Sequence, residues 1–85
     1  MTISPEVLGR YAADAAAEVA GVHTKQRRGA RVAGGEVEVH LVVDYGADIP
    51  RVAADVQRHV ADYLQRMADL TPTAVNVVVD DVQRG

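Results

Sequence analysis

The feature that most constrains the fold is an amphipathic segment at residues 49–69. Charged residues follow one side of it, and apolar residues recur on the other side at the three- and four-residue spacing of one face of an α-helix. Those apolar residues are Ile49, Val52, Ala53, Val56, Val60, Tyr63, Leu64 and Met67. Asp48 stands where an N-cap belongs and Pro50 falls in the first turn, both typical of a helix start. A helix of this length extends about 30 Å, and the rest of the chain has to cover one side of it.

A second helix is predicted at residues 5–19. Ser4 can cap its first turn, and Pro5 suits its first position. Apolar residues then recur every four positions, and Gly21 is typical of a helix end. The recurring residues are Val7, Tyr11, Ala15 and Val19. This helix therefore also has a single apolar stripe.

Alternating residues predict strands elsewhere in the chain. At residues 36–44 the apolar side chains point to one face and the polar side chains to the other. Gly34-Gly35 before this strand indicates a hairpin with a short strand at residues 30–33. Thr71-Pro72 ends the long helix, and the valines of residues 74–82 indicate a last strand.

These elements predict an α+β fold in one domain, residues 1–85. Their order is helix, strand, strand, helix, strand, and Thr2-Ile3 is a candidate for a further strand at the beginning. Each helix has one apolar stripe and each strand has one apolar face. The stable arrangement is then two layers: a small mixed β-sheet of three to four strands with both helices on one face.

The core of this domain must be built from small side chains. The chain contains 14 Ala and 16 Val but no Phe and no Trp. Such side chains bury little area each, and burial stabilises by roughly 25 cal/mol per Å². Small domains often gain further stability from disulfides, a metal or self-association. Because the sequence contains no Cys, disulfides and thiolate zinc sites are excluded, and self-association is the option that remains.

Residue types suited to catalysis or metal binding are few and scattered. The three histidines, His23, His40 and His59, show no His-x-x-x-His spacing. Asp55 and Asp62 flank His59 at helical spacing and could orient its ring, but a solvated helix face explains them as well. We therefore predict no catalytic residue, no metal site and no cofactor, and we expect that the chain is not an enzyme.

Two acidic pairs and two valines are weaker candidates for binding. Asp80-Asp81 and Glu36/Glu38 could hold a divalent cation, but no Asp-x-Asp-x-Asp-Gly loop accompanies them, so we interpret them as solvated strand ends. Val42 and Val78 fall on otherwise polar strand faces. Together they are candidates for a sheet-face contact with a partner, although a lone exposed valine needs no explanation.

Four of the nine basic residues are close together in one loop. They are Lys25, Arg27, Arg28 and Arg31. No acidic residue lies between Glu18 and Glu36, although the net charge of the chain is −3. This basic loop at residues 25–31 is a candidate contact for a partner or for an anion, either RNA or anionic lipid. The other interpretation is a solvated loop that keeps an acidic protein soluble.

A small nucleic-acid-binding module that uses the basic loop is therefore the alternative function. A KH-like domain is similar in outline, but it clamps the RNA backbone with a Gly-x-x-Gly loop. The sequence contains no Gly-x-x-Gly, and no aromatic residue near the basic loop can stack on a base. We do not expect nucleic acid as a partner.

The sequence also bears on location. The first residues, MTISPEVLGR, contain neither the basic region nor the apolar region of a secretory signal. No apolar run approaches the ~20 residues that span a bilayer. We expect a cytoplasmic protein without a direct membrane span.

Three segments in order resemble the alkaline-shock, or cell-envelope stress-response, protein family of bacteria. They are ISPEVLGRYAADAAAEVAGV at residues 3–22, VHLVVDYGADIPRVAADVQRHV at 39–60 and LTPTAVNVVVDDV at 70–82. Together they cover nearly the whole chain. The resemblance implies an α+β domain and a non-enzymatic role at the cytoplasmic side of the envelope. It also implies that the chain associates with itself or with a membrane-anchored partner of the same family, and it transfers no catalytic residue.

Replacing Lys25, Arg27, Arg28 and Arg31 together by Ser tests the alternative function. The fold should be retained, because surface substitutions usually change stability by no more than ~0.5 kcal/mol each. We expect no measurable binding of single-stranded RNA at physiological salt, with or without the substitutions, because the chain is acidic and lacks stacking aromatics. Fluorescence anisotropy over a salt series checks this. Sub-micromolar binding that the substitutions abolish would favour the nucleic-acid module.

Overall fold

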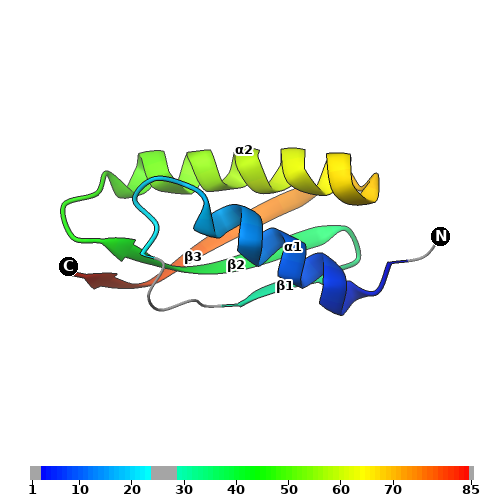
Figure 1. Cartoon of the computed structure of the whole chain (residues 1–85), viewed down its shortest axis with the longest axis horizontal. Coiled ribbons are helices and arrows are strands. Elements are labelled where there is room, and N and C mark those ends of the chain that lie inside the picture. Colours follow the sequence, from blue (N-terminus) through cyan, green and yellow to red (C-terminus); the bar gives the residue numbers. More distant parts are fainter. Residues whose placement is uncertain (1–2, 24–28, 85) are drawn as a thin grey trace.

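The computed structural model describes residues 3–23 and 29–84. Two helices and three strands follow one another in the order α1, β1, β2, α2, β3 (Figure 1). Their bounds are α1 Pro5–Ala17, β1 Ala30–Ala33, β2 Glu36–Asp44, α2 Ile49–Ala68 and β3 Ala74–Gln83. The predicted α+β class and the element order are confirmed. No additional strand precedes α1 in the described residues: Ile3 lies outside any strand, and Thr2 lies outside the described residues.

Helix α2 forms as the sequence predicts. The Asp48 carboxylate accepts a hydrogen bond from the Arg51 backbone N–H at 3.3 Å, which satisfies one of the free donors of the first turn. The helix ends at Asp69, whose backbone takes the left-handed conformation (φ 52°). Its central apolar residues are buried, whereas Ile49 and Met67 at its two ends are exposed. The stripe is therefore covered only along its middle.

Helix α1 is two residues shorter than predicted. Ser4 caps it through Val7 N–H at 3.3 Å, and Glu18 is its C-cap. The helix lies very close to β1 because Gly9 has no side chain: a Cβ atom there would stand only 2.7 Å from the Ala30 carbonyl oxygen. Gly9 thus sets how closely the first helix packs on the sheet.

The sheet is mixed, with the strand order β1-β2-β3. β1 and β2 form the predicted antiparallel hairpin, and both glycines of its turn, Gly34 and Gly35, have positive φ. β2 and β3 are parallel, so the chain has to cross over between them, and α2 provides this connection. The β2–β3 register shifts by one residue at a β-bulge between Leu41 and Val42.

Both helices pack on the same face of the sheet, with α2 along the length of the molecule (Figure 1). The core between the layers consists almost entirely of Ala and Val, as expected. Its buried members are Ala12, Ala15, Ala16, Val32, Val37, Val39, Leu41, Val43, Val52, Val56, Val60 and Leu64. β3 contributes only partly buried residues to it. The third strand is therefore the least covered part of the sheet.

Val56→Asp tests the assigned face of α2. Val56 is 0 % exposed, so the substitution buries an unpaired carboxylate and should unfold the domain or cost several kcal/mol. Ala54→Asp is the matched control, because Ala54 is on the exposed side of the same helix and should change the stability little. Thermal unfolding followed by circular dichroism compares the two. Similar melting temperatures for both variants would contradict the assigned face.

Candidate interaction surface

The face of the sheet opposite the helices is polar. On β2 it presents Glu36, Glu38 and His40, and the neighbouring strands place Arg31 of β1 and Asn76 of β3 on either side of Glu38. Side chains directly opposite on neighbouring strands point to the same face of a sheet. Because this face carries charges of both signs, it is well solvated and does not form an apolar docking surface.

His40 lies between two carboxylates on this face. Its Nδ1 is 3.1 Å from Asp80 Oδ2, and its Nε2 is 3.2 Å from Glu38 Oε2. The hydrogen bond to Asp80 and then the bond to Glu38 raise the pKa of His40 above its ordinary value, because both favour the protonated ring. In the protonated state each ring nitrogen donates to a carboxylate. No ring nitrogen is then left for a metal or for proton transfer to a substrate.

The acidic pairs that the sequence suggested for a cation do not converge. The bulge separates the roles of the two aspartates: Asp80 is bonded to His40, whereas Asp81 accepts bonds from Val82 N–H and Gln83 Nε2 of its own strand at 2.8 and 2.7 Å. Within the described ranges, no group of three His, Asp or Glu side chains is placed to hold a metal ion.

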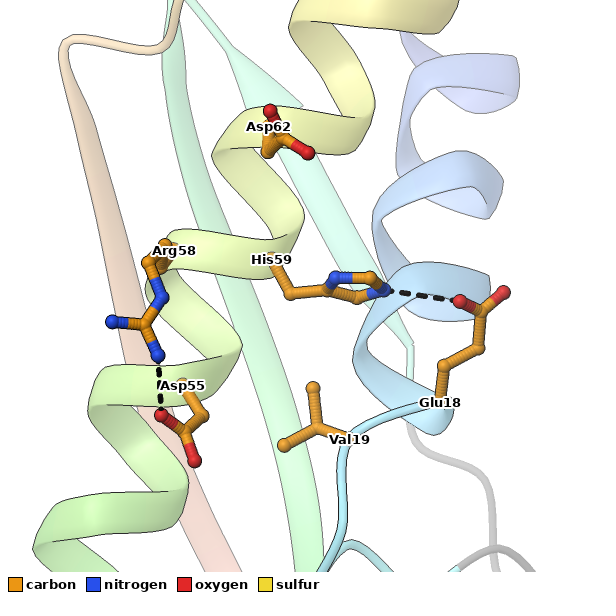
Figure 2. A pocket seen from close by; sticks show the side chains of 6 residues that line it. All are labelled: Glu18, Val19, Asp55, Arg58, His59 and Asp62. Atoms are coloured by element: carbon orange, nitrogen blue, oxygen red, sulfur yellow. Dashed lines mark hydrogen bonds and ion pairs between the residues drawn. The ribbon is translucent and has the colours of Figure 1, made fainter.

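A groove of ≈ 480 Å³ lies between the end of α1 and the middle of α2 (Figure 2). Its lining residues are Glu18, Val19, Asp55, Arg58, His59 and Asp62. His59 Nε2 is 3.0 Å from Glu18 Oε2, and Arg58 donates to Asp55 at 2.7 Å. His59 therefore pairs with α1 and not with Asp55 or Asp62 of its own helix. No sequence pattern indicated Glu18 as its partner, because Glu18 is 41 positions away.

Of the four basic residues predicted as a contact, the structure describes one. Lys25, Arg27 and Arg28 lie outside the described residues. Arg31 is exposed on β1, opposite Glu38 in the register. The basic loop therefore continues into a strand at Arg31, where a carboxylate is its neighbour.

The expected patch of two exposed valines is wrong for Val42. Val78 is 37 % exposed, but Val42 is only 1 % exposed. Val42 is on the central strand, where the His23 N–H donates to its carbonyl on one side at 2.7 Å and Asp81 is its partner on the other. Val42 therefore has a paired neighbour on each side, whereas Val78 is on the edge strand and is exposed.

The edge of the sheet at β3 is the second open feature. β3 is 10 residues long and pairs only with β2 in the described part of the chain. Gln57 of α2 reaches this strand, where its Nε2 donates to the Val75 carbonyl at 3.0 Å. At the other end, the Tyr45 N–H donates to the Gln83 carbonyl at 2.7 Å and continues the pairing with β2. Beyond Val75, the outer edge of β3 has no strand beside it in the described residues.

These features define a class of protein: a two-layer domain of order αββαβ with paired polar groups and one long open strand edge. A scan against protein-family models matches residues 25–84 to the alkaline shock protein 23 family, described as having a cell envelope-related function. The match covers more than half of the chain, so the chain belongs to this family, as its sequence indicated. Comparisons with curated proteins and with solved structures gave no match.

The helices also bear on the relation to the envelope. In the described ranges, neither α1 nor α2 combines the length and the apolar character needed to cross a membrane.

The cluster at His40 predicts a pH-dependent stability. A histidine whose pKa is raised in the folded state contributes its full stabilisation at pH values below its unfolded-state pKa of about 6.5. This contribution is lost as the pH rises through the folded-state pKa. The free energy of unfolding of the original chain, relative to that of His40→Gln, should therefore decrease as the pH rises above about 6.5.

Urea unfolding between about pH 5.5 and 9 measures this difference. Glu38, Asp80, Asp81 and Arg31 are the same in both proteins, so the difference between the two reports on His40. His23 and His59 are present in both proteins, so their contributions to the free energy of unfolding cancel in the difference. A difference that stays constant with pH would show that the two carboxylates do not stabilise the protonated ring.

Proposed function

We propose that the chain is a non-enzymatic interaction protein of the cell-envelope stress response. It acts at the cytoplasmic side of the envelope by binding to itself or to a membrane-anchored partner. Membership of a family with a cell envelope-related function supports the cellular context. The manner of action is argued below from the geometry of the described residues.

The observation that carries the proposal is the contrast between the histidines and the sheet edge. All three histidines lie within 3.2 Å of a carboxylate oxygen: His23 of Asp44, His40 of Glu38 and Asp80, and His59 of Glu18. Their rings join one element to another, as a structural role requires. The outer edge of β3, in contrast, has no strand beside it in the described residues, and Gln57 occupies only its Val75 carbonyl. Sheets bind other protein segments through the backbone donors and acceptors of such an edge.

The described surface gives less support to the alternative, a nucleic-acid module. Arg31 lies opposite Glu38 in the register, with Glu36 two residues away along β2, and Asp80 lies further along the same face. These carboxylates repel a phosphate backbone, whereas attraction to that backbone is the main source of nucleic-acid affinity.

Binding to membranes of defined composition tests the proposal. The purified chain is sedimented with membrane vesicles from the cells that produce it. The same vesicles after protease treatment and protein-free vesicles of the extracted lipids are the two comparison samples. We expect co-sedimentation with the intact vesicles only, because neither α1 nor α2 is long and apolar enough to cross a membrane and a protein partner supplies the attachment.

Three controls make the result specific. Nuclease treatment of the intact vesicles should not release the chain. Binding to protein-free lipid that disappears when the four basic residues of the loop are replaced would assign the attachment to anionic lipid. Failure to bind to any of the vesicles would contradict attachment through a membrane-anchored partner.

A further inference from the structure

We infer that the edge of β3 is an interface between two copies of this chain. The two β3 strands pair antiparallel about a two-fold axis at Val77 and join two three-stranded sheets into one. This inference rests on self-association, which is one of the two modes of the proposed function, and it names the surface, the partner and the register.

The two edges of the sheet are unequal. β1 has four residues, and α1 packs tightly over it at Gly9 and Ala30. β3 has 10 residues, and none of them is a Pro or a Lys, the residues that most often block an edge. An open edge that meets a second open edge of the same kind gives a closed, symmetric pair. The pairing of β3 with β3 is therefore favoured over the pairing of β3 with β1.

The bulge sets the length of the usable edge. Pairing with β2 is regular from Ala74 to Val79 and shifts before Asp81, so the regular part of the edge is centred on Val77. Only residues whose backbone groups point away from β2 can pair outward, and Gln57 already bonds to one of these groups at Val75. An axis at Val77 places Val75 opposite Val79 of the second copy and Val77 opposite its own counterpart.

The charges of β3 select the same register. With the axis at Val77, Asp80 lies opposite Ala74 of the second copy, and the two Asp80 residues are about 20 Å apart. That separation is well beyond the screening length of about 8 Å at physiological salt. Moving the axis to Val79 would bring the two Asp80 carboxylates to within about 7 Å. Moving it to Val75 would instead place Val77 opposite Thr73, which precedes the strand and whose N–H already donates to the Gly35 carbonyl.

The valines on the helix side of β3 gain cover in this arrangement. Val75, Val77 and Val79 pack against the core but are only partly buried. In the paired sheet they meet the same three residues of the second copy, which extends the apolar layer across the axis. A small Ala and Val core benefits from this additional burial.

Gln57 is a competitor for the interface. Its amide occupies the Val75 carbonyl, which in the pair accepts from the Val79 N–H of the second copy. Gln57→Ala should therefore strengthen the association, by severalfold if the competing hydrogen bond has a net worth of about 1 kcal/mol.

Two charge variants test the interface and its register by sedimentation equilibrium. Asn76 and Val78 are exposed. In the inferred register, Asn76 lies opposite Val78 of the second copy, and Val78 lies opposite Asn76 of the second copy. The variant Asn76→Lys, Val78→Lys places like charges opposite one another twice and should weaken the dimer at least tenfold. The variant Asn76→Glu, Val78→Lys places opposite charges there and should retain the dimer, with an affinity that decreases at high salt.

A single cysteine provides a second measurement, because the chain contains none. In the inferred register the two Cα atoms at position 77 are about 4.5–5.5 Å apart, within the range of a disulfide. Val77→Cys should therefore form a covalent dimer under mild oxidation, whereas Ala74→Cys, at about 20 Å from its counterpart, should not.

Each outcome decides the inference. Dimers that are insensitive to both charge variants, or that crosslink equally at positions 74 and 77, would place the interface elsewhere and overturn the inference while self-association remains. A monomer at tens of micromolar would overturn the inference, but the proposed function would still stand if the chain binds to protein-containing membranes. Loss of vesicle binding with a retained dimer would contradict attachment through a membrane-anchored partner and leave the inferred interface in place.

Discussion

The structure depends on the one apolar core that the valine stripe of α2 shares with α1 and with the helix-facing side of the sheet. Val56 and Val60 on the helix and Val37 and Val43 on the strand are all fully buried. Short side chains let the elements around this core approach closely and leave little tolerance for an inserted atom. α1 and β1 are then held by the same layer, and Gly9 lets the helix approach the strand without a side chain between them.

The fold could be predicted largely because its signals are local. Caps at Ser4 and Asp48, the glycine turn and the periodicity of α2 each depend on residues that are close in the sequence. α1 ends two residues early because Glu18 already serves as its cap. The two-layer arrangement followed from the single apolar face of each element, but the bulge did not, since nothing in the run of valines marks where the register shifts.

The candidate site could be predicted only in part, because its contacts join distant residues. The spacing on α2 suggested partners for His59 on its own helix, but the packing of α1 brings Glu18 closer. His40 was recognised as a polar strand residue, whereas its position between Glu38 and Asp80 required the parallel pairing of β2 with β3. Val42 was expected to be exposed from alternation alone. Alternation describes the direction of a side chain, and burial also depends on what flanks a central strand.

The parallel pairing of β2 with β3 has a consequence for the order of folding during synthesis. A hairpin can form as soon as its two strands have left the ribosome, but a parallel partner must wait for the whole crossover. β1, β2 and α2 emerge first, and β3 is the last element of the chain. One side of β2 therefore stays unpaired throughout the synthesis of α2, and nascent chains on neighbouring ribosomes expose this central strand to one another before β3 covers it.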